Sequence, residues 1–197
     1  MQSERLAPIY YHIVAQCLGR ARLVNTTWFY DYLMADNNAS NHRHLIETFY
    51  TAFSKRDYAG MAACYHPDVE FKDEAFDVTG NRAKAMWHML CERGKDLVIE
   101  FDGVEADETS GKAHWEAKYS FSATGRKVHN IIDARFEFAD GLIVKHIDRF
   151  NFWKWSSQAL GISGTLLGWT PILRNAVRKK AAAGLDAFIR KHADLYP

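Results

Sequence analysis

Cysteine is scarce in this sequence of 197 residues: Cys17, Cys64 and Cys91 lie far apart and form no C-x-x-C pair. Disulfide frameworks and cysteine zinc sites need closer spacing, so the sequence predicts reduced thiols in a cytoplasmic protein. Long apolar runs are also missing, because none reaches the roughly 18 residues that a transmembrane helix needs. The first residues lack the apolar segment and cleavage site of a secretory signal, which argues against export.

An excess of charge of one sign is absent as well, since the formal net charge is +1. A nucleic-acid-binding domain usually carries a clear basic excess, so nucleic acid is not an expected partner. No metal-ligand spacing and no nucleotide-binding motif occurs, and we therefore expect no cofactor and no metal. Apolar material is plentiful instead: hydrophobic residues make up 48% and aromatic residues 14%, enough for one domain with a substantial core.

The N-terminal segment, residues 1–33, is rich in Tyr, Leu, Arg and Ala, with apolar residues between Ile9 and Cys17 spaced as in a short helix. A polar stretch that begins at Met34 separates this segment from the next apolar pattern. We therefore expect three parts. These are an extension outside the fold (1–40), the domain itself (41–155), and a C-terminal loop with an amphipathic helix (156–197).

Three helices are predicted at the start of the domain. The first follows Asn41 as its N-cap. Its apolar stripe has helical spacing and consists of Leu45, Ile46, Phe49, Tyr50 and Phe53. The second helix follows Asp57 and is stopped by Pro67. The third covers residues 81–93, where Gly94 ends it.

Strands follow the helices, because the apolar period changes from about 3.6 to 2 after Gly94. The predicted strands cover residues 69–76 (short), 97–106, 112–123, 127–138 and 142–152. Helices first and a meander of strands afterwards indicate an α+β fold. We expect a curved antiparallel sheet with the three N-terminal helices packed in its concave face and an extra C-terminal helix.

The C-terminal segment has a strong helix start, with Thr170 as N-cap and Pro171 at the first helical position. From Thr170 to the end it carries a local charge of +4, and the rest of the chain carries about −3. Two interpretations stay open for this helix. It lies on a membrane surface, because Leu166, Leu167 and Trp169 precede a cationic stretch. Alternatively, it packs its apolar stripe on the domain or on a partner subunit.

Two segments resemble a known superfamily. LIETFYTAFSKRDYAGMAACYHPDVEFKD is similar to the opening of the nuclear-transport-factor-two-like superfamily, and FEFADGLIVKHIDRFNFW resembles its closing hairpin. The superfamily includes SnoaL-like polyketide cyclases, ketosteroid isomerase, limonene epoxide hydrolase and scytalone dehydratase. The resemblance covers residues 43–155. It implies a cone-shaped cavity between the helices and the concave face of the sheet.

The same resemblance places the aspartate of the last strand, Asp148, inside the cavity. Strand alternation then turns Val144, His146 and Phe152 inward with it. The expected catalytic residues are Asp148, Asp73 and His146. The expected ligand-binding residues are Tyr119, Asn130, Trp115, Trp87, Phe71, Met86, Phe136 and Phe150. A mostly aromatic pocket with a few polar groups is typical of a small-molecule site.

A carboxyl group among aromatic side chains has its charged form disfavoured, so Asp148 becomes able to exchange a proton near neutral pH. The superfamily's reaction signatures are incomplete here. The Arg-x-Asp pair of limonene epoxide hydrolase is replaced by Trp115-Glu116-Ala117, and the tyrosine of ketosteroid isomerase by Phe49. The base of ketosteroid isomerase does match Asp73. Isomerisation, cyclisation, dehydration and hydrolysis all stay open as reactions on an apolar, oxygenated substrate.

Two other functions stay open beside an enzyme. One is a non-catalytic domain whose pocket binds a hydrophobic molecule. The other is an interaction domain that dimerises through the outer face of the sheet. His129, Asp133 and Arg135 alternate with apolar residues and are predicted to lie on that outer face.

Overall fold

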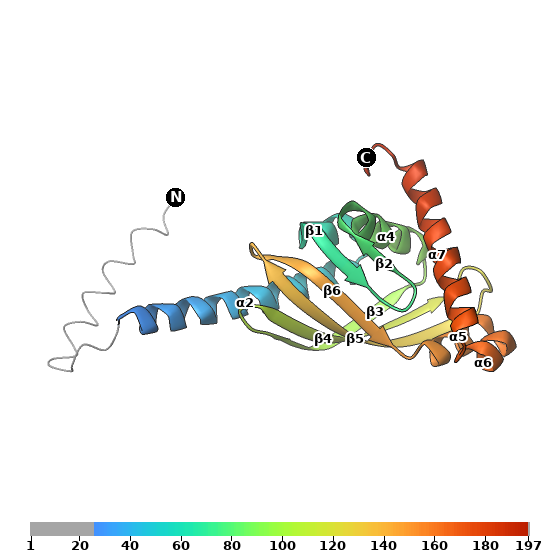
Figure 1. The fold of residues 1–197 in the computed structure, drawn as a ribbon, viewed down its shortest axis with the longest axis horizontal. Helices are drawn as coiled ribbons and strands as arrows, with labels where there is room; N and C mark the ends of the chain where they lie inside the picture. Colours follow the sequence, from blue (N-terminus) through green and yellow to red (C-terminus); the bar gives the residue numbers. More distant parts are fainter. Residues whose placement is uncertain (1–25, 197) are drawn as a thin grey trace. The chain divides into compact units, whose positions relative to one another are not determined.

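The computed structural model describes the backbone of residues 26–196 and the side chains of residues 37–196. A six-stranded curved sheet forms the centre of this part of the chain, and the C-terminal half of helix α2 lies against its concave face (Figure 1). The short helix predicted between Ile9 and Cys17 lies outside the described residues. The predicted limits of the domain therefore stay predictions.

Helix α2 (Thr26–Ser54) is much longer than the predicted first helix. The prediction that the helix starts at Asn41 is wrong, because Asn41 lies in its interior and is exposed. Residues such as Asn and Asp cost only about 0.7 kcal/mol each in a helix, so an exposed polar stretch does not end one. The apolar stripe is correct: Ile46, Phe49 and Tyr50 are fully buried.

The next two helices agree with their sequence signals. Helix α3 (Tyr58–Ala63) has Asp57 as its N-cap, whose side chain accepts a hydrogen bond from the Gly60 N–H. Helix α4 (Gly80–Arg93) ends at Gly94 as predicted. Pro67, however, does not stop a helix. It lies in a strand, at an irregular stretch of pairing where its missing N–H is tolerated.

The strands confirm the α+β fold class. They are β1 (Tyr65–Lys72), β2 (Asp77–Thr79), β3 (Val98–Ala106), β4 (Ser110–Ser120), β5 (Lys127–Ala139) and β6 (Leu142–Phe150). Their order in the sheet is β2-β1-β6-β5-β4-β3. All neighbours are antiparallel except β1 and β6, which run parallel and are separated in the chain by helix α4 and four strands.

An irregularity in the last hairpin changes which residues of β6 face inward. The β5–β6 register shifts after Glu137, so that Phe138 pairs with Ile143 and Val144 is left without a partner. Ile143 is therefore fully buried and Val144 only half-buried, contrary to the predicted alternation. The strand also ends earlier than predicted. Phe152 begins helix α5 and belongs to a second apolar cluster.

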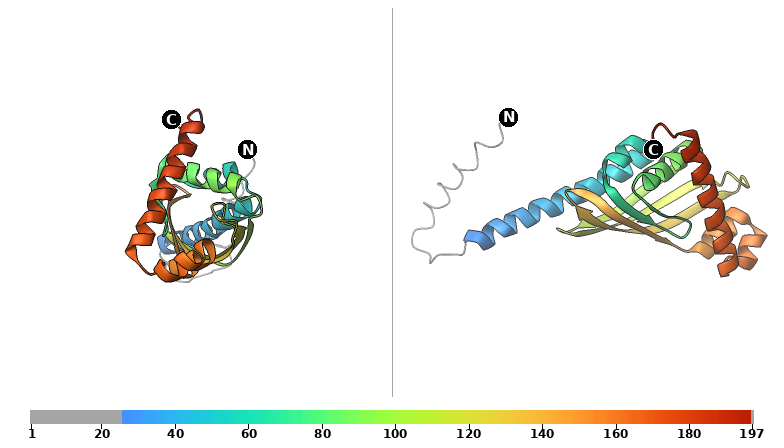
Figure 2. Two further views of the ribbon diagram at one scale, coloured as in Figure 1. Left: turned by 90° about the vertical axis from the view of Figure 1, so that its right-hand side faces the viewer. Right: turned by 45° about the horizontal axis from the view of Figure 1, so that its top comes forward.

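Three helices rather than one follow the sheet: α5 (Phe152–Leu160), α6 (Ile162–Leu167) and α7 (Pro171–Lys191). Helix α7 crosses beside α4 (Figure 2). Leu185 and Phe188 of α7 are buried in the main core, so the prediction that this helix packs on the domain is confirmed. In the described part of the chain, no helix is long and apolar enough to cross a membrane.

Candidate functional site

A chain of hydrogen bonds runs through the interior, between strands β1 and β6. The Trp87 indole N–H donates to the Tyr65 hydroxyl at 2.8 Å, and that hydroxyl lies 2.7 Å from Nδ1 of His146. Nε2 of His146 lies 3.0 Å from a carboxylate oxygen of Asp148. With Asp148 ionised, His146 carries its proton on Nε2 and donates it there, while Nδ1 accepts from Tyr65.

The carboxylate of Asp148 receives a second hydrogen bond, from the Trp115 indole N–H at 3.2 Å. Neither the backbone nor Arg149, which is exposed, binds this carboxylate. The side chains of His146 and Asp148 are only 0% and 3% exposed. A buried charge is costly unless it is hydrogen-bonded, and these two donors lower that cost.

Aromatic rings surround the His146 imidazole on several sides. The ring of Phe136 lies 4.4 Å from it between centroids, and Trp87 stacks on it at 5.9 Å. Phe49 and Phe71 meet it edge-on, at 5.4 and 5.1 Å. The packing fixes the imidazole plane, so His146 holds the Asp148 carboxylate in one orientation.

Asp73 lies at the end of β1 and is half-buried. One of its carboxylate oxygens accepts the backbone N–H groups of Ala75, at 2.7 Å, and Phe76. This is the turn contact that a purely structural aspartate would make. Burial nevertheless raises the pKa of Asp73 to about 7, and the negative charge of Asp148 adds to the rise. Asp73 is not hydrogen-bonded to Asp148, but the two carboxylates lie close enough to interact.

Tyr50 was treated at the sequence level only as part of an apolar stripe. Its hydroxyl is fully buried and has no hydrogen-bond partner among the described residues. Burial raises the pKa of Tyr50 well above its ordinary value, and the nearby charge of Asp148 adds to this. A buried hydroxyl without a partner costs about 1–3 kcal/mol, so its presence calls for a reason.

Tyr65 was also missed, although the sequence did contain a signal for it. It lies at the same strand parity as Val69 and Phe71, and all three are buried. Because Pro67 was expected to end a helix, Tyr65 was assigned to that helix and its alternation with Val69 and Phe71 in one strand was not recognised. Tyr50 gave no signal of this kind, because only the fold brings its hydroxyl within the influence of the Asp148 charge.

The predicted ligand-binding residues divide into two groups. Five are packed in the main core: Trp87, Trp115, Phe71, Met86 and Phe136. Three are half-buried: Tyr119, Asn130 and Phe150. The half-buried group lies nearer the surface, and it is the part of the predicted set that a ligand would reach first.

Tyr119 joins this half-buried group to helix α5. Its hydroxyl accepts a hydrogen bond from the Trp155 indole N–H at 2.9 Å. Burial raises the pKa of Tyr119, and the charge of Asp73 adds to the rise. Trp155 packs against the ring of Phe150 as well. Because α5 was predicted as strand and loop, Trp155 was not among the expected site residues.

Helix α7 fixes the loop that follows Asp73. Arg174 pairs with the Glu74 carboxylate at 2.6 Å, and Arg178 donates to the Glu74 backbone carbonyl at 3.0 Å. The Arg174 guanidinium also lies 4.9 Å from the centre of the Phe152 ring. The C-terminal helix thus holds the β1–β2 loop and α5 together beside the candidate site.

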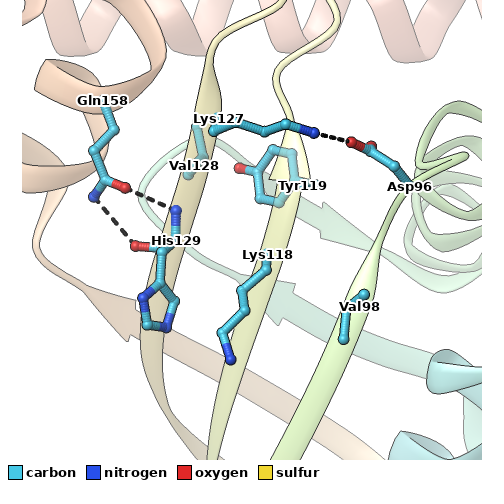
Figure 3. Close-up of a pocket in the computed structure, with 8 residues that line it drawn as sticks. All are labelled: Asp96, Val98, Lys118, Tyr119, Lys127, Val128, His129 and Gln158. Carbon is cyan, nitrogen blue, oxygen red and sulfur yellow. Dashed lines mark hydrogen bonds and ion pairs between the residues drawn. The ribbon is translucent and has the colours of Figure 1, made fainter.

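An open pocket of about 340 Å³ lies apart from the carboxylates, at the ends of β3, β4 and β5 (Figure 3). Lys127 pairs with Asp96 there at 2.9 Å, and Gln158 bonds the backbone of His129. Of the predicted site residues, Tyr119 alone lines this pocket. The polar rim of the pocket consists of contacts between surface side chains. Asp73, His146 and Asp148 do not line it.

The outer face of the sheet is polar, as predicted. His129, Asp133 and Arg135 are exposed. The side chain of Asp133 pairs with His114 at 2.9 Å, and His129 pairs with Glu116. The turned-out orientation of His129 and Asp133 is confirmed, whereas dimerisation through this face stays a prediction.

Cys64 and Cys91 are both buried and free, which agrees with the predicted reduced thiols. Burial raises the pKa of each thiol to about 11, so neither is an activated nucleophile. Cys17 lies outside the described residues. The predicted absence of a metal and a cofactor stays a prediction.

A helix in the concave face of a curved sheet, with a buried aspartate on the strand that closes the last hairpin, defines the class of cone-shaped α+β domains. The SnoaL-like domain model matches residues 46–146, which is just over half of the chain. The protein belongs to the SnoaL-like family. No curated protein matches the chain in sequence.

Solved structures share the fold at low sequence identity. A SnoaL-like polyketide cyclase from Jannaschia sp. CCS1 has a TM-score of 0.55 and 11% identity, covering 61% of this chain and 92% of its own. An LEH-like epoxide hydrolase from M. tuberculosis has a TM-score of 0.52 and 17% identity, covering 66% and 97%. A protein assigned as a polyketide cyclase from Xanthomonas campestris has a TM-score of 0.52 and 20% identity, covering 62% and 98%. At this identity the likeness concerns the fold alone.

Proposed function

We propose that the protein is a small-molecule enzyme that moves a proton on an apolar, oxygenated substrate, with Asp73 as the acid–base group. The observation that carries this proposal is the contrast between two carboxyls. Asp148 is buried and held by His146 and Trp115, whereas Asp73 lies nearer the surface with a pKa of about 7. Two interacting carboxyls in such different environments are typical of acid–base sites.

Each residue has a distinct role in this proposal. The Asp73 carboxylate takes a proton from a carbon or hydroxyl of the substrate and returns it at another atom. The fixed charge of Asp148 strengthens Asp73 as a base, and His146 keeps that charge in place. The unpartnered hydroxyl of Tyr50 offers a hydrogen bond to a substrate oxygen on which negative charge develops.

The half-buried residues would bind the apolar part of the substrate. Tyr119 and Phe150 offer ring surface, and the Asn130 side chain offers an amide. Solved structures of this fold carry the names of polyketide cyclases and an epoxide hydrolase, and polyketides and epoxides both contain oxygen. Isomerisation, cyclisation, dehydration and hydrolysis are the reaction types that fit one mobile proton and no cofactor.

A panel of cyclic ketones, enones and epoxides in D₂O, followed by mass spectrometry, tests the proposal. We expect deuterium incorporation or turnover for some members, with an inflection of the rate near pH 7. Asp73→Asn should lower the rate by about 100-fold or more, as loss of general acid–base catalysis does. Asp194→Asn, an exposed site far along the chain, is the matched control and should keep full activity.

A non-catalytic binding domain is the second candidate. The half-buried Tyr119, Asn130 and Phe150 favour it, because they could hold an apolar molecule whether or not Asp73 transfers a proton. If panel members raise the melting temperature and none is turned over at any pH, this candidate replaces the enzyme. A cytoplasmic location and a homodimer formed by the outer sheet face remain part of the proposal under both candidates.

A further inference from the structure

Helix α6 carries its large apolar side chains on the outside. Ile162 is 80% exposed and Leu166 is 64% exposed, whereas the buried positions are Gly164 and Gly168. A Cβ atom on Gly164 would lie 1.8 Å from the Ser156 carbonyl oxygen, so the α6 backbone lies directly against α5. This is the reverse of an ordinary amphipathic helix, in which the large apolar residues face the core.

The neighbouring segments extend this exposed surface. We call it the apolar corner, and it consists of Trp153, Ile162, Leu166, Leu167, Trp169 and Ile172. The Trp153 indole N–H donates to the Thr165 carbonyl, and the Trp169 indole N–H donates to the Leu166 carbonyl, each at 3.0 Å. Both indole donors are already satisfied within the protein. Transfer of these rings into an apolar phase would therefore leave no unpaired N–H.

The segment of the chain that carries the apolar corner has charged residues of one sign only. Residues 151–183 contain no Asp and no Glu, but they contain five basic residues: Lys154, Arg174, Arg178, Lys179 and Lys180. The rest of the chain then has a net charge of −4. Lys179 lies seven residues after Ile172 on α7, on the same exposed face of that helix. Lys179 and Lys180 are therefore exposed beside the apolar corner and do not pack in the core.

We propose that the apolar corner docks the protein on the surface of an anionic lipid bilayer. Trp153 and Trp169 would lie at the headgroup level, where tryptophan is enriched, and Leu166 would reach the acyl chains. The flanking lysines would meet anionic headgroups, which attract basic side chains near the membrane surface. Beyond its first turn, which carries Ile172, α7 does not lie in the bilayer, because Leu185 and Phe188 are buried on the domain.

Charge favours a bilayer over a second copy of the chain as the occupant. Two copies joined corner to corner would bring their basic residues together, and like charges oppose such an interface. An anionic surface instead complements Lys154, Lys179 and Lys180, which are all exposed. Because no described helix is long and apolar enough to cross a membrane, the docking concerns one leaflet.

Co-sedimentation of the full chain with vesicles tests this proposal. We expect binding to vesicles of phosphatidylcholine mixed with phosphatidylglycerol, weaker binding to phosphatidylcholine alone, and release by salt. Leu166→Ser with Trp169→Ser should weaken binding by tenfold or more, because two large apolar side chains would no longer enter the bilayer. Val98→Ser with Leu195→Ser, at sites 51% and 50% exposed elsewhere, is the matched control and should bind as the unchanged protein does.

A second measurement locates the contact. Lipids with brominated acyl chains should quench tryptophan fluorescence of the full chain, and Trp153→Phe with Trp169→Phe should abolish the quenching. Absence of binding to anionic vesicles at low salt would overturn the proposal, as would equal loss in the control variant. It would also be overturned if Leu166→Ser with Trp169→Ser converted a dimer to a monomer without vesicles, since the corner would then belong to a second copy.

Discussion

At the scale of single residues, two of the histidine–aspartate pairs among the described residues lie in opposite surroundings. His146 and Asp148 are buried among aromatic rings, and their hydrogen bond measures 3.0 Å. His114 and Asp133 pair at 2.9 Å on the outer face, where the Asp133 side chain is 81% exposed. The same two side chains thus serve as an internal anchor in one place and as a solvated surface contact in the other.

Substituting each histidine should separate these two roles. His146→Ala removes one donor from the buried Asp148 carboxylate and the partner of the Tyr65 hydroxyl, which should cost about 3–5 kcal/mol of unfolding free energy. His114→Ala should change that free energy by about 1 kcal/mol or less, because an exposed pair is screened by water. Urea unfolding of the two variants checks this, and equal losses would contradict a buried anchor.

Asp73 should make stability depend on pH. Its pKa is raised from 3.8 to about 7 in the folded protein, so the folded state binds the proton more tightly than the unfolded state. The stabilisation is therefore complete below about pH 4 and is lost as the pH rises to about 7. Asp73→Asn keeps an oxygen for the Ala75 and Phe76 N–H groups but cannot titrate. Its unfolding free energy should fall less over this range than that of the unchanged protein, with Asp194→Asn as the control.

At the scale of elements, α2 shows how little a polar stretch says about where a helix begins. The segment from Ala35 to Asn41 has the composition of a linker, yet it is helical throughout. Downstream burial of Ile46, Phe49 and Tyr50 anchors the helix, and elongation upstream adds one hydrogen bond per residue. A helix anchored at one end can therefore continue through residues of modest propensity.

Substitution of Asn41 distinguishes a helix interior from a helix start by the sign of its effect. In the interior of α2, Asn41→Ala should raise the unfolding free energy by up to about 0.7 kcal/mol, since alanine is the better helix former. An N-cap asparagine would instead lose about 0.5–2 kcal/mol on the same change. Asp57→Ala, at the N-cap of α3, is the control and should show that loss in thermal unfolding.

At the scale of the whole molecule, α7 ties together parts of the chain that lie far apart in sequence. Its Arg174 holds Glu74 after β1, its Asp186 pairs with Arg82 of α4 at 2.6 Å, and its Leu185 is fully buried. The helix thus connects the loop beside the candidate site to the main core. We infer that it is an integral part of the fold.

Leu185→Ala should therefore cost about 2–5 kcal/mol, the range for removing a buried leucine side chain. The same chemical change at Leu166, which is 64% exposed, should alter the unfolding free energy by about 0.5 kcal/mol or less. Chemical denaturation of both variants provides the comparison. A small effect at Leu185 would show that α7 contributes little to the core.

Periodicity and turn chemistry determined a large part of this protein at the sequence level. The α2 stripe, the Asp57 and Thr170 caps, the Gly94 stop and the alternation along β5 are all local signals, and the structure agrees with each. The inward orientation of His146 and Asp148 was predicted from the family resemblance and from the two-residue alternation of side chains along a strand, and both residues are buried. Local spacing suffices wherever neighbours in the chain decide which way a side chain points.

Tertiary structure alone decided the features that depend on distant partners. The shifted register that buries Ile143 arises from pairing with β5, and the parallel pairing of β1 with β6 joins segments some 80 residues apart. The Tyr65–His146 contact, the unpartnered hydroxyl of Tyr50 and the proximity of Asp73 to Asp148 also depend on how the sheet curves. Helix α6 packs its glycine face against α5, and its leucines are therefore exposed to solvent. Only the packing of the two helices decides this orientation.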